Sequence, residues 1–189
     1  LAILFVAPPE KDFDWDEKAV AGANRFIKRA WRVVWELTKT ADAAAILDLA
    51  TLDEPSAKLN RELHALGIRC TREFDEGQFN TAISAVMELI NAASSYLNEV
   101  PESERSRALC YRVASDIVAM LAPIIPHWAD ELQHAALHKK TPVYHEPWPV
   151  FDEAQAKSNT VEIAVQIKGK VRARIMVDAE ASEEELSCL

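Results

Sequence analysis

One stretch of the chain, residues 79–97 (FNTAISAVMELINAASSYL), constrains the fold more than any other. Its apolar residues recur at the three- and four-residue spacing of one helical face, namely Ile83, Val86, Met87, Ile90, Ala93 and Leu97. The other faces are also mostly apolar, and Glu88 is the only charged side chain in the stretch. A helix that is apolar on most sides is usually buried by other helices. We therefore predict a helical bundle with this helix at its centre, capped by Asn80 or Thr81.

The size and composition of the chain agree with a globular helical protein. At 189 residues and 21.1 kDa it is long enough for one domain with a small appendage. Its 49% hydrophobic and 27% charged residues are typical of soluble globular proteins. No apolar run approaches the roughly 20 residues of a membrane span, and no signal peptide is visible. Three widely spaced cysteines favour a reducing compartment, so we expect a cytoplasmic protein.

The first long helix is predicted over residues 17–37, and it carries a row of positive charges. Asp14 or Asp16 can cap its N-terminus. Opposite its apolar face lie Arg25, Lys28, Arg29 and Arg32, which at about 100° per residue span an arc of only about 100°. Exposed helix faces usually mix charges of both signs and so form i,i+4 ion pairs, whereas the stretch from Arg25 to Arg32 contains no acid. It is therefore either a solvated face or a row of phosphate contacts.

A second helix, predicted over residues 57–73, repeats this pattern with a narrow arc of Lys58, Arg61, Arg69 and Arg72. The net charge of −9 argues against a nucleic-acid partner unless the charges are unevenly distributed. They are uneven, because acids gather around residues 10–17, 99–104 and 178–185. We interpret the two stripes together as one continuous basic surface that would contact phosphates. Cys70 on this helix is expected to be a small buried apolar residue rather than a nucleophile.

Two more helices are predicted to complete the bundle. One follows an N-cap at Ser103 and reaches Leu121, and a short one covers residues 127–137 after a proline. His134 and His138 lie four residues apart on one face of the short helix. No Cys or carboxylate completes a set of metal ligands at the usual spacing, so we predict no metal site.

A β-hairpin is predicted near the end of the chain, because apolar and polar residues alternate on both sides of the sequence KGK. A three-residue loop would pair Ile167 with Val171 and Val165 with Ala173, leaving one apolar face, whereas a two-residue turn would mix apolar and basic side chains. We predict the three-residue loop and, after it, a further helix capped by Ser182. The hairpin would carry basic residues at its tip and on its solvent side, namely Lys168, Lys170, Arg172 and Arg174.

Several stretches, in this order, resemble the C-terminal part of bacterial-type leucyl-tRNA synthetases. APPEKDFDW and RFIKRAWRVVWEL are similar to the segment that follows the catalytic core in that family. FNTAISAVMELIN and MLAPIIPHWADEL resemble its anticodon-binding bundle, and HEPWPVFDEA with VEIAVQIKGKVRARI resembles its linker and the first hairpin of its C-terminal domain. The resemblance implies a mainly α fold, with a helical bundle of the class I synthetase anticodon-binding type followed by a β-hairpin and the start of a small α/β domain.

The resemblance divides the chain into four parts. Residues 1–16 would be the tail of the catalytic core and a connector, residues 17–141 the anticodon-binding bundle, residues 142–160 a proline-rich linker, and residues 161–189 a truncated C-terminal domain. The chain starts inside the apolar run LAILFVA and stops inside a helical pattern, so we expect it to be a fragment.

The resemblance implies that the chain positions tRNA(Leu) for ATP-dependent leucylation. The HIGH and KMSKS signatures that hold ATP in the family's catalytic core are absent from this sequence, as is the editing domain. No catalytic residue is therefore assigned, and ATP and magnesium would be cofactors of the missing core alone. The sequence itself also gives no reason to assign a catalytic residue, since it contains no glycine-rich phosphate loop and no nucleophile–base pair. The expected partners are tRNA(Leu) and the missing core of the same chain, and we expect no interaction with a membrane.

Two other interpretations stay open on the sequence. Isoleucyl and valyl enzymes carry motifs similar to LAPIIPH, so the chain could be the same region of another class I synthetase, although APPEKD and QIKGKVRARI favour the leucyl enzyme. A helical scaffold that binds a protein through an apolar groove would leave the basic stripes merely solvated. Trp35 beside the first stripe either packs in the bundle or stacks on an unpaired base. The tRNA interpretation assigns phosphate contacts to Arg25, Lys28, Arg29, Arg32, Lys58, Arg61, Arg69, Arg72, Lys168, Lys170 and Arg172.

Overall fold

The computed structural model describes residues 1–12, 14–157, 160–167 and 170–178, and this part of the chain is mainly helical, as predicted. None of its helices is both long enough and apolar enough to cross a membrane. The α-helices are α1 (Ala2–Val6), α2 (Glu17–Thr40), α3 (Glu54–Asp75), α4 (Phe79–Glu99), α5 (Arg107–Leu121), α6 (Pro126–Ala135) and α7 (Glu153–Ala156). Short 3₁₀ turns lie at Leu49–Thr51, Glu102–Glu104 and Val143–His145.

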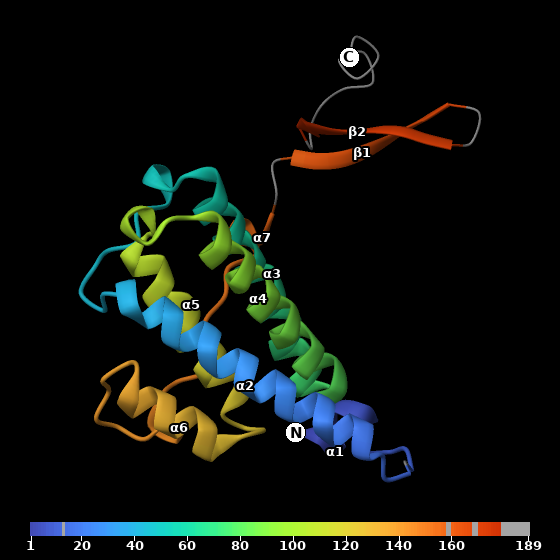
Figure 1. Ribbon diagram of the computed structural model, residues 1–189, viewed down its shortest axis with the longest axis vertical. Coiled ribbons are helices and arrows are strands. Elements are labelled where there is room, and N and C mark those ends of the chain that lie inside the picture. Colours follow the sequence, from blue (N-terminus) through green and yellow to red (C-terminus); the bar gives the residue numbers. More distant parts are fainter. Residues whose placement is uncertain (13, 158–159, 168–169, 179–189) are drawn as a thin grey trace.

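Helix α4 lies at the centre of the bundle, as its sequence predicts (Figure 1). It packs against α1, α2, α3 and α5. The predicted core face is buried at Ile83 and Ile90, and the small and apolar residues on the other faces, such as Ala85 and Leu89, are buried as completely. Burial on several sides follows from the near absence of charge along this helix.

The caps of α2 and α4 test two predictions. Asp16 caps α2, because its Oδ1 accepts a hydrogen bond from the Lys18 backbone N–H at 2.8 Å. The predicted cap of α4 is wrong, since the N-cap residue is Gln78 and makes no side-chain cap bond. Thr81, proposed as that cap, is inside the first turn, where its Oγ1 lies 2.9 Å from the Gln78 carbonyl oxygen.

Helices α3 and α5 begin elsewhere than predicted. Helix α3 starts three residues earlier, after an N-cap at Asp53, with Pro55 in the first turn, where its missing N–H leaves no hydrogen bond unmade. Helix α5 starts later, with Ser106 rather than Ser103 as its N-cap. The guanidinium of Arg105 explains the delay, because it donates to two carbonyls at the end of α4 and so holds the connection outside the helix.

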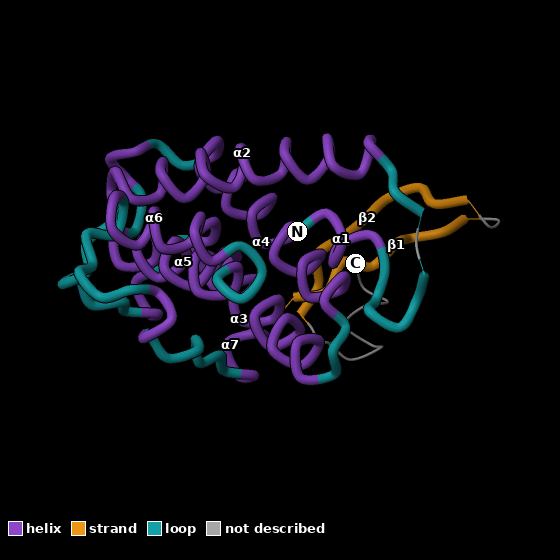
Figure 2. Tube along the Cα trace, turned by 90° about the horizontal axis from the view of Figure 1, so that it is seen from below, coloured by secondary structure: helices purple, strands orange, loops and turns teal. Residues whose placement is uncertain are grey.

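Helices α2 and α3 lie on different sides of the bundle. Helix α2 packs on α4, α5 and α6, and α3 packs on α4, α5 and α7. Figure 2 shows α2 along one edge of the bundle and α3 with α7 toward the other.

Part of the predicted linker packs on α3, and we call residues 147–157 the strap. Trp148 donates from Nε1 to the Thr71 hydroxyl at 2.8 Å. The ring of Phe151 lies directly on Gly67, where an added Cβ would come within 2.3 Å of it. A side chain at this position would therefore displace the ring, which explains a glycine in the interior of a long helix.

Hydrogen bonds to buried polar groups also hold the strap. The Asp152 backbone N–H donates to Nδ1 of His64 at 2.8 Å, and burial lowers the pKa of His64, which favours the neutral ring. Arg112 of α5 donates from Nη2 to the Val150 carbonyl at 2.6 Å and from Nε to Asp116. Burial raises the pKa of Asp116 to about 6, although Arg112 acts in the opposite direction.

Beyond the strap, β1 (Thr160–Ile167) and β2 (Lys170–Asp178) form an antiparallel pair. Val165 pairs with Ala173, as predicted, but Ile167 pairs with Lys170 instead of Val171, so the predicted three-residue loop is wrong. The register shifts between Val165 and Gln166, as at a β-bulge, where one strand contributes an extra residue. The predicted loop residues 168 and 169 and the predicted helix from Ser182 lie outside the described residues.

Candidate nucleic-acid interface

The basic residues of α2 form an exposed row, which we call the α2 row: Arg25, Lys28, Arg29 and Arg32. The opposite face of the helix is buried at Phe26, Ala30, Val33, Val34 and Leu37, so the row points away from the core. Within the described residues, none of the four makes an ion pair. The row is thus a concentrated, uncompensated positive charge on an acidic chain.

The basic residues of α3 differ, because acids neutralise most of them. Lys58 is exposed and makes no ion pair with any residue that the structure describes. Each arginine of the stripe, in contrast, bonds to a carboxylate: Arg61 to Glu54 at 2.6 Å, Arg69 to Glu88 at 3.0 Å and Arg72 to Glu73 at 2.9 Å. Helix α3 therefore offers fewer free cations than its sequence suggests.

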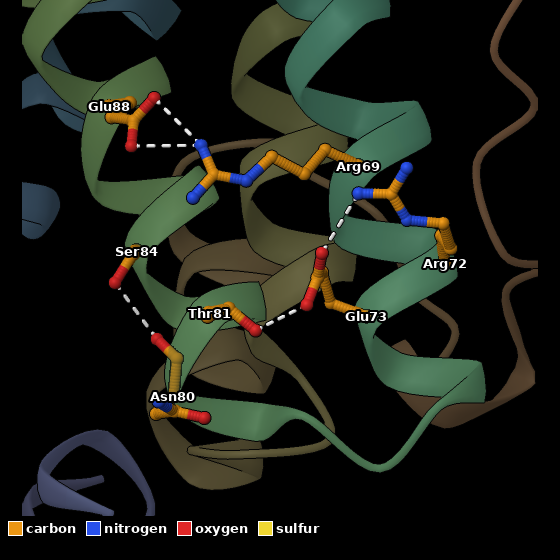
Figure 3. A network of polar contacts seen from close by, with 7 residues as sticks. All are labelled: Arg69, Arg72, Glu73, Asn80, Thr81, Ser84 and Glu88. Atoms are coloured by element: carbon orange, nitrogen blue, oxygen red, sulfur yellow. Dashed lines mark hydrogen bonds and ion pairs between the residues drawn. The ribbon is translucent and has the colours of Figure 1, made fainter.

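Figure 3 shows how α3 and α4 share these charges. Arg69 reaches across to α4, where its Nη1 lies 3.0 and 3.1 Å from the two carboxylate oxygens of Glu88. Glu73 accepts hydrogen bonds from both Thr81 and Arg72, which lower the pKa of its carboxyl, and it raises the pKa of Arg72 in turn.

One continuous basic surface stays a prediction, and the arrangement of the helices bears on it. Helices α4 and α5 each pack against both α2 and α3, and Figure 2 shows α2 and α3 on different sides of the bundle. On the hairpin, Lys170 and Arg172 lie on β2, of which only the backbone is described, and Lys168 lies outside the described residues. The assignment of all eleven residues to phosphate contact stays a prediction.

Two other groups, the Cys70 thiol and the His134 ring, were considered as reactive or metal-binding groups. Cys70 is fully buried, and burial raises its pKa to about 12, so it is the apolar core residue that we predicted. His134 lies with Nδ1 2.6 Å from the Lys139 carbonyl and with Nε2 3.6 Å from Asp130. In the part of the chain that the structure describes, no three His, Cys, Asp or Glu side chains come together as metal ligands.

Comparisons with known proteins agree with one another. Residues 57–187 match the family model "Anticodon-binding domain of tRNA ligase". The chain is 37% identical over 185 residues to the leucine–tRNA ligase of Thermotoga maritima and 41% identical over 186 residues to that of Proteus mirabilis. These alignments cover 97% of this chain but only 22% and 21% of the two relatives. The chain thus spans about a fifth of the length of the curated relatives that it matches.

The fold is also similar to that of a solved structure. It superposes with a TM-score of 0.77 on the LeuRS in a ternary complex from Agrobacterium radiobacter, described as LeuRS–tRNA–LeuAMS. The superposition covers 99% of this chain and 23% of that one, at 22% sequence identity. At this identity the likeness concerns the fold alone.

Proposed function

The chain belongs to the family of anticodon-binding domains of tRNA ligases, and on this premise we propose that it is the tRNA-binding region of a leucine–tRNA ligase. It would position tRNA(Leu) for ATP-dependent leucylation by a catalytic core outside this chain. ATP and magnesium would be cofactors of that core, and we assign no catalytic residue here. We expect the protein in the cytoplasm, which agrees with the buried free thiols of Cys70 and Cys110.

The α2 row is the observation that carries this proposal. Four exposed cations that form no ion pair with any described residue are costly to gather on one face, because like charges repel. An RNA backbone would offset that repulsion, with arginines donating paired hydrogen bonds to phosphate oxygens and Lys28 acting as a point charge. At 1.5 Å per residue, the row is about 10 Å long from Arg25 to Arg32.

These contacts would provide affinity and register rather than choice of sequence, because phosphates are the same at every nucleotide. Lys58 and the hairpin residues would add contacts elsewhere on the RNA. The paired arginines of α3 would contribute less, since each must first leave a carboxylate at 2.6 to 3.0 Å.

The test is a salt titration of the whole 189-residue chain against a leucine tRNA transcript. The logarithm of the binding constant should fall linearly with the logarithm of the salt concentration. The double variant Arg29→Gln, Arg32→Gln should reduce that slope by about 1.4 to 1.8, at about 0.7 to 0.9 for each lost phosphate contact. The matched control Arg61→Gln, Arg72→Gln removes two arginines that are already paired and should reduce the slope by less.

Two results would contradict the proposal. One is the absence of salt-dependent binding by the folded wild-type chain at low salt. The other is an unchanged slope in the α2 double variant, because the row would then lie away from the RNA. A protein-binding scaffold would give the first result.

A further inference from the structure

We propose that Trp35 is a stacking platform for an unpaired base of the RNA whose phosphates lie along the α2 row, an inference that rests on the proposed function. Trp35 is 40% exposed, which is unusual for a large indole on a helix that packs in a bundle. It follows Arg32 by three residues and Lys28 by seven, so it lies on the same side of the helix, about 5 and 10 Å further along its axis. The row of cations thus ends at an exposed aromatic ring.

The ring of Trp35 is held in place by other aromatic rings. It lies nearly parallel to the ring of Trp31, with the centroids 6.4 Å apart and the planes 11° apart. Trp31 in turn meets Trp128 of α6 edge to face, at 6.2 Å and 76°. Trp31 and Trp128 are partly buried against the core, so the platform is backed by rigid packing. A preformed aromatic face costs little conformational entropy when a ligand stacks on it.

The surrounding charge indicates the kind of partner. An unpaired base has a flat π face that can stack on an exposed indole, and its phosphate can contact a neighbouring cation. Within the described residues, Arg32 and Lys28 have no carboxylate partner that would compete with such a phosphate. The nearest acid along the helix, Glu36, already accepts hydrogen bonds from Lys39 at 2.7 and 2.8 Å. An apolar protein partner would match the ring but not the free cations.

Trp15 provides a matched comparison. It is 68% exposed, yet it stands among acids, with Asp14, Asp16 and Glu17 next to it in the sequence. Exposure of an indole is therefore shared by both positions, whereas Trp35 follows the four cations of the α2 row and Trp15 stands between two acids.

The experiment compares Trp35→Leu with Trp15→Leu in the whole chain. The probes are a ten-nucleotide single-stranded RNA of mixed sequence, the duplex that it forms with its complement, and a leucine tRNA transcript. Trp35→Leu should bind the single strand about 5- to 150-fold more weakly, which is the range expected for one stacked base. Its salt slope should stay unchanged, because no phosphate contact is lost. Duplex binding and both properties of Trp15→Leu should match the wild type.

Loss of structure is controlled by a measurement that needs no variant. Irradiation of the wild-type chain with a single strand containing 5-iodouridine should crosslink the peptide that contains Trp35. A crosslink confined to other peptides would overturn the inference, as would equal losses of single-strand and duplex binding in Trp35→Leu. If the wild type binds tRNA with a steep salt slope and Trp35→Leu binds the single strand equally well, the platform is refuted and the proposed function stands. If the wild type binds none of the RNAs, both fail.

Discussion

Gly67→Ala should release the strap from α3 while leaving the bundle folded. An alanine Cβ at this position would lie 2.3 to 2.4 Å from three atoms of the Phe151 ring, far inside contact distance. The helix backbone cannot move without breaking its hydrogen bonds, so the ring has to leave. The adjacent hydrogen bond from the Asp152 N–H to Nδ1 of His64 should break with it.

The expected magnitude combines three contributions. Phe151 is partly exposed, so loss of its packing should cost about 1 to 2 kcal/mol, less than a fully buried phenylalanine. The lost hydrogen bond should cost about 1 kcal/mol. Alanine gains about 1 kcal/mol over glycine in a helix interior. The net loss in the free energy of unfolding is therefore about 1 to 2 kcal/mol, whereas the strap alone loses about 2 to 3 kcal/mol.

Hydrogen exchange measured by mass spectrometry separates these two effects. Amides of residues 148–156 should exchange about 30- to 150-fold faster in Gly67→Ala, with α4 and α5 unchanged. Gly22→Ala is the matched control, because its Cβ would meet only Nη2 of Arg25 at 3.8 Å, and it should stabilise the chain by about 1 kcal/mol. Unchanged exchange in the strap together with a similar gain in Gly67→Ala would show that Phe151 does not lie on Gly67.

Three further predictions concern single groups. Burial lowers the pKa of His64 from 6.5, so its neutral ring should stabilise the strap fully above pH 6.5 and progressively less as the pH falls. In His64→Asn, hydrogen exchange of the strap should lose this pH dependence. Asp116 titrates in both proteins, so the difference between them reports His64 alone. Glu88→Gln should change the free energy of unfolding by less than about 0.5 kcal/mol, since the Arg69–Glu88 pair is exposed. It should free Arg69 for a phosphate and so raise the salt slope of tRNA binding by about 0.7 to 0.9. An unchanged slope would place α3 away from the RNA. With a thiol pKa of about 12, only about one in ten thousand Cys70 side chains should be in the thiolate form at pH 8, so Cys70 should be alkylated only after unfolding. Rapid alkylation of the folded chain would contradict its burial.

Predictions from local patterns were the successful ones. The three- and four-residue spacing in α4 predicted its central position, because a helix that is apolar on most sides is usually buried by other helices. The cap at Asp16 was predicted correctly, since capping depends on neighbouring residues alone. The cap at Ser103 was predicted wrongly, because Arg105 binds carbonyls of α4 and so shifts the start of α5. That interaction depends on where α4 ends in space.

The same distinction applies to the candidate interface. The sequence by itself determined the α2 row, because four cations at helical spacing face one direction whatever the rest of the chain does. Only the tertiary structure decided that the α3 arginines are paired, with Arg69 bonded to Glu88 nineteen residues further along the chain. It likewise decided that the strap lies on α3, since His64 and Asp152 are 88 residues apart. Helical periodicity is a property of neighbouring residues. Which carboxylate pairs with an arginine, and which side chain lies on a helix glycine, depends instead on which segments pack together.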